Sequence, residues 1–214
     1  VSHVSPDGDA VGSLLGAANM LKDMGKTVTA VLDDGVPDYL TFLPHADSVV
    51  TQLLEGEWDV FLSVDASDEE RTGKAGLYGR EHSKVVINLD HHPTNTMFGD
   101  IHLVLPTAVS GTEIISRWID TMPDYHPSPE VAIPLLTGLV TDTLGFRTNN
   151  VTSETLTIVT KLMQYCASLT EITQRTFDNR SINTVYLWRE AFSSVELHQG
   201  GVVAANITQD ALKK

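Results

Sequence analysis

The segment His3-Val4-Ser5-Pro6-Asp7-Gly8-Asp9 decides how the N-terminal half of this chain is interpreted, because it joins an apolar stretch to a helical pattern. Val1 to Ser5 is typical of the end of a buried strand, and the apolar spacing predicts an amphipathic helix from about Ala10 to Met24. An imidazole and two carboxylates therefore lie in the turn, where Gly8 allows the backbone to fold so that they converge. Turns rich in Asp and Gly are also common without any chemical role, so this segment alone leaves both interpretations open.

Two further clusters follow stretches that are typical of buried strands. The apolar run 60–64 stops at Asp65, and the run 85–89 stops at Asp90-His91-His92. In open α/β sheets, ligands bind outside the carboxyl ends of the strands, so we expect both clusters to lie beside the first. An aspartate such as Asp65 is otherwise a common helix cap or turn residue, whereas two histidines directly after an aspartate are poorly explained by packing.

The fourth cluster, Thr141-Asp142, lies within the apolar stretch 135–146. A carboxylate there is costly to bury without a partner, and a metal ion would provide one. Together the four clusters combine hard carboxylates with a few imidazoles, which are the donors that Mn, Mg or Zn require when two ions are held close together. The residues therefore predict metal-assisted hydrolysis.

Apolar runs alternate with helical patterns in the first half, which predicts an α/β fold with a doubly wound parallel sheet and a helical C-terminal part. Ser110 to Glu113 and Ser168 to Glu171 have the pattern of capping boxes, and Ser128-Pro129-Glu130 opens a helix that should bring Asp142 near its end. The other expected strands are 27–32, 102–105 and 202–207, and the other expected helices are 38–43, 152–167 and 179–188.

Composition limits the classes of partner. The net charge of −14 and the isoelectric point near 4.8 argue against long nucleic acids, which require a broad basic surface. No run of about 18 apolar residues and no signal-peptide pattern is found, so we expect neither a membrane span nor export. The single cysteine, Cys166, excludes an internal disulfide, suits the reducing cytoplasm and is expected to pack in the interior.

We expect three parts in the chain: a catalytic domain over residues 1–180, a helical connector over 181–199 and the start of a truncated second domain over 200–214. Gly200-Gly201 breaks the helical pattern before the last part. The chain has no initiator Met and opens directly in a motif, so we expect it to be a fragment of a longer protein.

The order His-x-x-x-Asp-x-Asp, Asp, Asp-His-His, Asp resembles the DHH phosphoesterase superfamily, which includes RecJ exonucleases, and the resemblance runs from Val1 to about Arg180. The segments from His3 to Ser13 and from Thr141 to Arg147 look most like the NrnA-type branch of nanoRNases and pAp phosphatases. That branch hydrolyses short RNA and 3′-phosphoadenosine 5′-phosphate (pAp), and related members cleave cyclic di-AMP or its linear product. The resemblance implies two divalent metal ions, typically Mn²⁺.

The resemblance also implies a role for each motif residue. One ion would be held by His3 and Asp7, and the other by Asp9, His91 and Asp142, while Asp65 would bridge them. Asp90 would orient a ligand, and His92 would contact the phosphate or donate a proton.

Several alternatives stay open at this point. Arg147 could bind the substrate phosphate or form a surface ion pair, and the backbone N–H groups of residues 110–112 could bind an anion or only cap a helix. Apolar residues from Val185 to Phe192 could form a homodimer or pack between domains. The alternatives to an RNA or pAp hydrolase are a cyclic dinucleotide phosphodiesterase acting on c-di-AMP or pApA, a family II inorganic pyrophosphatase, and a metal-binding regulatory module without turnover. The second domain of oligonucleotide-cleaving members carries a Gly-Gly-rich, His-containing segment, of which only an opening strand is recognisable here.

Overall fold

Helix α1 (Gly8–Asp23) begins directly at the first motif, in a computed structural model that describes residues 1–165, 167–178 and 182–212. Asp7 is its N-cap: the carboxylate accepts hydrogen bonds from the backbone N–H groups of Asp9 and Ala10, both at 3.0 Å. This cap explains why the helix begins at Gly8 rather than at the expected Ala10. The first carboxylate of the motif thus shapes the turn that holds the second.

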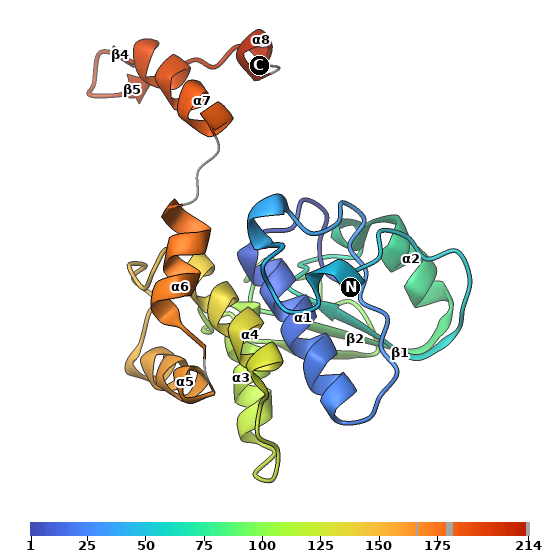
Figure 1. The fold of residues 1–214 in the computed structure, drawn as a ribbon. Coiled ribbons are helices and arrows are strands. Elements are labelled where there is room, and N and C mark those ends of the chain that lie inside the picture. Colours follow the sequence, from blue (N-terminus) through green and yellow to red (C-terminus); the bar gives the residue numbers. More distant parts are fainter. Residues whose placement is uncertain (166, 179–181, 213–214) are drawn as a thin grey trace. The chain divides into compact units, whose positions relative to one another are not determined.

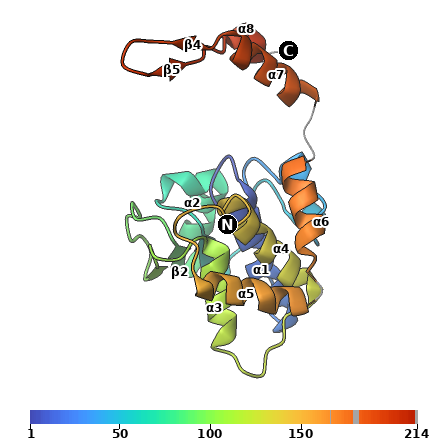
Figure 2. The ribbon, with the colours of Figure 1, turned by 90° about the vertical axis from the view of Figure 1, so that its left-hand side faces the viewer.

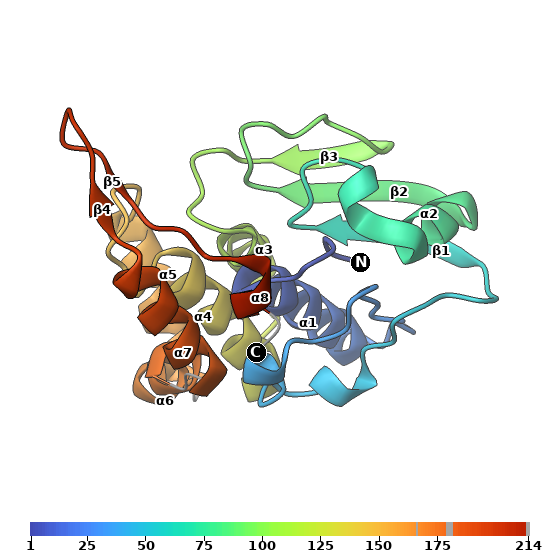
Figure 3. The same cartoon turned by 90° about the horizontal axis from the view of Figure 1, so that it is seen from above.

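Three parallel strands form the central sheet, in the order β1-β2-β3 (Figure 3). Their bounds are β1 (Trp58–Val64), β2 (Ser83–Asp90) and β3 (Ile101–Val104). Val64 pairs with Leu89, so the strands that precede Asp65 and His91 end at the same edge of the sheet. The parallel α/β fold expected from the sequence is therefore confirmed.

Two expected strands are wrong. From residues 1–5, only Val1 pairs with β1: its amino group donates to the carbonyl of Leu62, and its carbonyl accepts from Val64 N–H at 2.9 Å. The stretch 27–32 pairs with Val50 instead of with the sheet, through a single parallel bridge at Val31. Beyond Val1 the first segment turns away from β1, where Val4 N–H donates to the carbonyl of Arg71, and the stretch 27–32 bonds to a loop residue, so neither segment adds a strand to the sheet.

Helix α2 (Gly73–Glu81) follows β1 and packs against the sheet, where Gly79 lies close to Phe61. The helical part that follows β3 comprises α3 (Gly111–Asp120), α4 (Pro129–Asp142), α5 (Ser153–Gln164) and α6 (Leu169–Thr173). Helix α5 lies against α3 and α4 (Figure 2). As expected, α4 begins at Pro129 and ends at Asp142.

Helices α1 and α4 are in close contact (Figure 1). A Cβ atom at Gly12 would lie 2.6 Å from the carbonyl oxygen of Pro134, so the two backbones approach without a side chain between them. Asp9 lies on α1 and Asp142 at the end of α4. The close approach of the helices therefore brings two of the four clusters together.

Both expected capping boxes are only half formed. The Ser110 hydroxyl accepts from Glu113 N–H at 3.0 Å, but the carboxylate of Glu113 accepts from Val109 N–H and from Arg117 rather than from Ser110 N–H. At α6, the hydroxyl of Ser168 accepts from Glu171 N–H at 3.2 Å, but the carboxylate of Glu171 accepts from Arg175. Glu113 thus links the start of α3 to its second turn instead of closing a reciprocal cap.

Short single-turn elements lie between these helices and strands in the described part of the chain. The expected helix at 38–43 is only a short 3₁₀ turn. The elements are η1 (Asp38–Leu40), η2 (Ala46–Ser48), η3 (Glu70–Thr72) and the π-helical η4 (Gln174–Asp178).

The chain divides into two compact units, Val1–Thr176 and Phe177–Lys214. The second unit contains α7 (Ile182–Ser193), β4 (Glu196–Leu197), β5 (Val203–Ala204) and α8 (Gln209–Leu212), and β4 and β5 pair antiparallel. The strand expected over 202–207 is therefore shorter than predicted, and no residue of α7 is buried. Residues 179–181 of the expected connector helix and Cys166 lie outside the described residues. No helix among the described residues is long and apolar enough to cross a bilayer.

Candidate metal centre

The first group of donors lies where the N-terminal segment meets the end of β1. The Nε2 atom of His3 is 3.9 Å from Asp7 Oδ1 and 3.7 Å from Asp65 Oδ2. One donor atom from each of these three residues lies within 4.8 Å of the others. His3 and Asp65 are buried while Asp7 is exposed, so the group opens to solvent on one side.

The second group combines β2, α1 and α4. The Nε2 atom of His91 is 3.8 Å from Asp9 Oδ2 and 3.8 Å from Asp142 Oδ2. The donor atoms of these three residues also lie within 4.8 Å of one another. Four motifs that are far apart in the sequence thus meet at one edge of the sheet.

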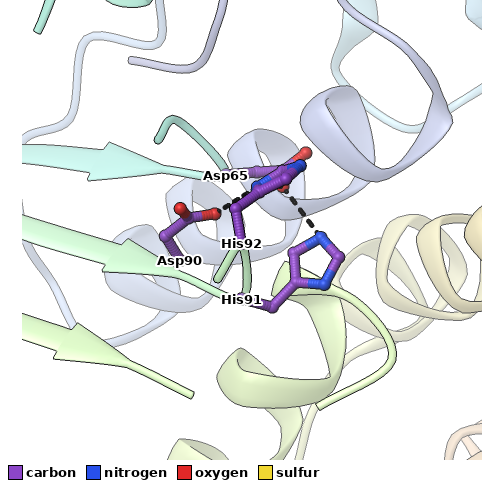
Figure 4. Close-up of side chains that lie close together, drawn as sticks. All are labelled: Asp65, Asp90, His91 and His92. Carbon is purple, nitrogen blue, oxygen red and sulfur yellow. Dashed lines mark hydrogen bonds and ion pairs between the residues drawn. The ribbon is translucent and has the colours of Figure 1, made fainter. Parts of the chain in front are cut away.

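Asp65 faces both groups with different oxygen atoms. Its Oδ2 atom faces His3, and its Oδ1 atom lies 3.4 Å from His91 Nε2 (Figure 4). Oδ1 is buried, and no described protein atom forms a hydrogen bond with it. The backbone of Asp65 is left-handed, with φ 55°, and its N–H is held by Leu89 O at 2.9 Å. A buried carboxylate oxygen without a donor is what a shared cation would satisfy.

Without metal ions, the carboxylates at this edge of the sheet bring an excess of negative charge together. Burial raises the pKa of Asp65 well above its usual range, and the neighbouring Asp9 raises it further. Burial and the charge of Asp9 likewise raise the pKa of Asp142 to about 7. Burial lowers the pKa of His91, but the interaction with Asp65 and the charge of Asp9 outweigh this and raise it to about 9. Carboxylates this close repel one another, and divalent cations would neutralise them.

Asp9 is held by the start of α3. Its carboxylate accepts from Gly111 N–H at 2.6 Å, from Thr112 N–H at 3.1 Å and from the Thr112 hydroxyl at 2.8 Å. Of the two alternatives left open for residues 110–112, the structure shows the cap, which Ser110 provides; the N–H groups of Gly111 and Thr112 are used by the chain's own Asp9 carboxylate. The sequence signal was a small residue followed by threonine at a helix start, but nothing in it indicated Asp9 as the partner.

Asp90 is fully buried and acts on the second histidine of its motif. Its Oδ1 accepts from His92 Nδ1 at 2.7 Å (Figure 4), and its Oδ2 accepts from the Asn95 amide at 2.6 Å. Burial raises the pKa of Asp90, but the hydrogen bonds from His92 and Asn95 outweigh it, so that the pKa lies below its usual range. Sequence reasoning missed Asn95, which lies four residues after His91 in an ordinary turn.

Arg147 follows α4 and is exposed, and its Nε donates to the carbonyl of Leu144 at 2.7 Å. The histidines outside the motifs belong to none of the donor groups among the described residues; they are His45, His82, His102, His126 and His198. A role for Arg147 with substrate stays a prediction.

A family model and two curated relatives assign the chain to the same family. A family model described as the DHH family, N-terminal domain, matches residues 1–139. The bifunctional oligoribonuclease and PAP phosphatase NrnA of Thermus thermophilus is 35% identical over 214 residues, which cover 98% of this chain and 63% of that protein. The bifunctional oligoribonuclease and PAP phosphatase NrnA of Bacillus subtilis is 29% identical over 217 residues, covering 99% and 66%.

A similar fold occurs among solved structures. An exopolyphosphatase-related protein from Bacteroides fragilis superposes with a TM-score of 0.85 at 26% identity, covering 92% of this chain and 61% of that one. The chain thus spans somewhat less than two thirds of the length of each of these three proteins.

Proposed function

Because the chain belongs to the DHH family, we propose that it is the catalytic part of a metal-dependent phosphoesterase that hydrolyses short oligoribonucleotides and pAp. The observation that carries the proposal is Asp65, whose two oxygens face separate groups of donors. The named activities of the Thermus thermophilus and Bacillus subtilis relatives support the choice of substrate class.

The donor set fits two divalent ions. His3 and Asp7 would hold one ion, Asp9, His91 and Asp142 would hold the other, and Asp65 would be shared. Carboxylates with a minority of imidazoles suit Mn²⁺ better than a soft metal, so we propose Mn²⁺. When bound, such a pair lowers the pKa of water and stabilises charge on the phosphoryl group.

The protein's own residues position the reacting groups. Asp90 holds Nδ1 of His92, which leaves Nε2 of that imidazole free to contact a phosphate oxygen or to protonate the leaving group. His92 is about one-third exposed, so that a substrate can reach it. Arg147 is also exposed, and its guanidinium would add a charge-assisted contact to a substrate phosphate.

The three parts expected from the sequence have separate proposed roles. We assign catalysis to residues 1–180, a connecting role to 181–199 and the start of a substrate-binding domain to 200–214. The exposed apolar residues of α7, such as Val185 and Phe192, would also suit a homodimer. We place the protein in the cytoplasm, where a chain with a single cysteine needs no disulfide. The acidic net charge favours short substrates over long nucleic acids.

A substrate panel tests the proposal. The protein is incubated with Mn²⁺ and, separately, pAp, an RNA dinucleotide, cyclic di-AMP, linear pApA and pyrophosphate, and phosphate or nucleotide release is measured. We expect turnover of pAp and of the dinucleotide, and none with the Asp65→Asn variant. Turnover of pyrophosphate alone would replace the proposal with a pyrophosphatase, and preference for cyclic di-AMP with a cyclic dinucleotide phosphodiesterase. If no substrate is turned over, the metal-binding module without turnover becomes the favoured alternative.

A further inference from the structure

Asn95 lies in the loop between β2 and β3 and is not a donor in any of the metal groups among the described residues. Its side-chain oxygen accepts from the backbone N–H of Met97 at 2.6 Å. A backbone N–H can only donate, so this contact fixes which way the amide faces. The amide nitrogen must therefore face the opposite side, where Asp90 Oδ2 lies at 2.6 Å.

The same amide nitrogen faces two further acceptors. These are the side-chain oxygen of Asn88 at 2.9 Å and the carbonyl of Ala66 at 3.2 Å. Asn88 also donates to the Ala66 carbonyl, at 3.1 Å. One amide thus links the end of β2 to the residue that follows Asp65 after β1.

Asp90 transmits this restraint to His92. With the Asn95 amide on Oδ2, the carboxylate presents Oδ1 to His92 Nδ1 at 2.7 Å, as Figure 4 shows for Asp90 and His92. Because the Asp90 carboxylate only accepts, His92 must carry a hydrogen on Nδ1. The other ring nitrogen, Nε2, then has either a lone pair or a second proton to offer to the substrate. The orientation of His92 therefore depends on a side chain that does not touch it.

We propose that Asn95 is a positioning residue: it fixes the Asp90 carboxylate, which in turn holds the His92 imidazole with Nε2 directed to the substrate. This inference rests on the proposed phosphoesterase function for its kinetic consequence, but its structural part is independent of that function.

The side chain at this position needs a donor on one side and an acceptor on the other. Aspartate has the same shape and can still accept from Met97 N–H, but it would place a carboxylate oxygen against Asp90 Oδ2. Asn95→Asp therefore keeps the turn and removes the contact with Asp90. Thr96→Val is the matched control, because its hydroxyl makes only a 3.4 Å contact with Ser67 O and none with Asp90.

Three measurements on the parent and both variants test the proposal. Steady-state kinetics with pAp separates kcat from KM, calorimetric titration measures Mn²⁺ affinity, and long-range ¹H–¹⁵N NMR spectra with Mg²⁺ report the tautomer of His92. For Asn95→Asp we expect kcat to fall about 10- to 100-fold, as for other residues that orient an active-site group, with Mn²⁺ affinity retained. His92 should lose its pure Nδ1–H tautomer. Thr96→Val should match the parent in all three.

Two results would overturn the proposal. One is an Asn95→Asp variant with parental kcat and the parental His92 tautomer. The other is a parallel loss of Mn²⁺ affinity, which would mean that Asn95 acts on Asp65 through Ala66 instead of on Asp90. If the parent itself turns over no substrate, the proposed function fails, and the NMR spectra still decide the role of Asn95.

Discussion

Asp65→Asn should stabilise the metal-free protein while it abolishes metal-dependent activity. Asp65 is 2% exposed, its Oδ1 has no hydrogen-bond donor among the described residues, and burial together with Asp9 raises its pKa well above the usual range. For an acid whose pKa is higher in the folded state than in the unfolded state, folding stability falls as the pH rises above the unfolded pKa. At neutral pH the Asp65 carboxylate therefore destabilises the metal-free fold.

The size of the effect follows from burial. Leaving a buried polar group without a hydrogen-bond partner costs about 1–3 kcal/mol, and Asn removes the charge while it keeps the shape. Asn also tolerates the left-handed backbone at this position, where φ is 55°. For a protein of this size, each kcal/mol corresponds to about 2–4 °C in the melting temperature. We expect the metal-free variant to melt about 2–12 °C above the parent.

Bound metal should reverse the order of the two melting temperatures, so that the parent melts above Asp65→Asn. Binding stabilises the folded state by RT ln(1 + [L]/Kd), which is about 2.7 kcal/mol at a hundredfold excess of the metal over Kd. The parent should gain this stabilisation with Mn²⁺, and the variant, without a shared carboxylate, should gain far less. Melting is followed by circular dichroism with EDTA and with Mn²⁺, and turnover is measured with pAp.

His45→Asn is the control, because His45 is exposed and lies outside every donor group among the described residues, and Asn tolerates its left-handed backbone, where φ is 65°. It should leave both melting temperatures and turnover at the parental values. The reasoning is refuted if metal-free Asp65→Asn melts below the parent, or if the variant retains parental kcat.

Three other substitutions test the support of the centre. Gly12→Ala places a Cβ 2.6 Å from Pro134 O, so it should separate α1 from α4 and cost about 1–3 kcal/mol of stability. The same shift should move Asp9 away from Asp142 and weaken Mn²⁺ binding, and parental Mn²⁺ affinity in a calorimetric titration would contradict this. Thr112→Val removes the hydrogen bonds of the hydroxyl with Asp9 and with Ser110, both at 2.8 Å, and should cost about 1–1.5 kcal/mol in denaturant unfolding. Thr157→Val, whose exposed hydroxyl bonds to Ser153 O, should cost less, and equal losses would show that the buried contacts of Thr112 contribute nothing particular. Arg147→Ala should raise KM for pAp and leave Mn²⁺ affinity unchanged, and an unaltered KM would return Arg147 to an ordinary surface role.

The sequence predicted the sheet and the convergence of the clusters because both depend on local patterns. Apolar runs ending in Asp65 and Asp90 identify parallel strands, and their carboxyl ends must meet at one edge. The helix that ends at Asp142 was also predicted, since Pro129 marks its first residue. These features required no knowledge of which residues contact each other across the chain.

The features that the sequence did not predict depend on contacts between residues that are far apart in the chain. The stretch 27–32 has the composition of a strand, but its partner is Val50 in a loop, which no local pattern specifies. The contacts of Gly111 and Thr112 with Asp9 join residues that are 102 and 103 positions apart. Asn95 resembles any turn asparagine until its amide is seen against Asp90. Side-chain partners over long separations are properties of the packed fold, and a single sequence does not specify them.

An intact metal centre therefore requires two separate things, the donor residues and the close backbone contacts that place them. Gly12 lets α1 approach α4, and at Gly111 a Cβ would lie 3.3 Å from both Asp9 Oδ2 and Asp65 Cβ. Neither glycine belongs to a donor group, yet a side chain at either position would press on the elements that position the carboxylates of those groups. A related chain with all six donors but a larger residue at position 12 or 111 would keep the motifs and lose the geometry of the centre. These two backbone positions are thus a second criterion for an intact site, beside the motif residues themselves.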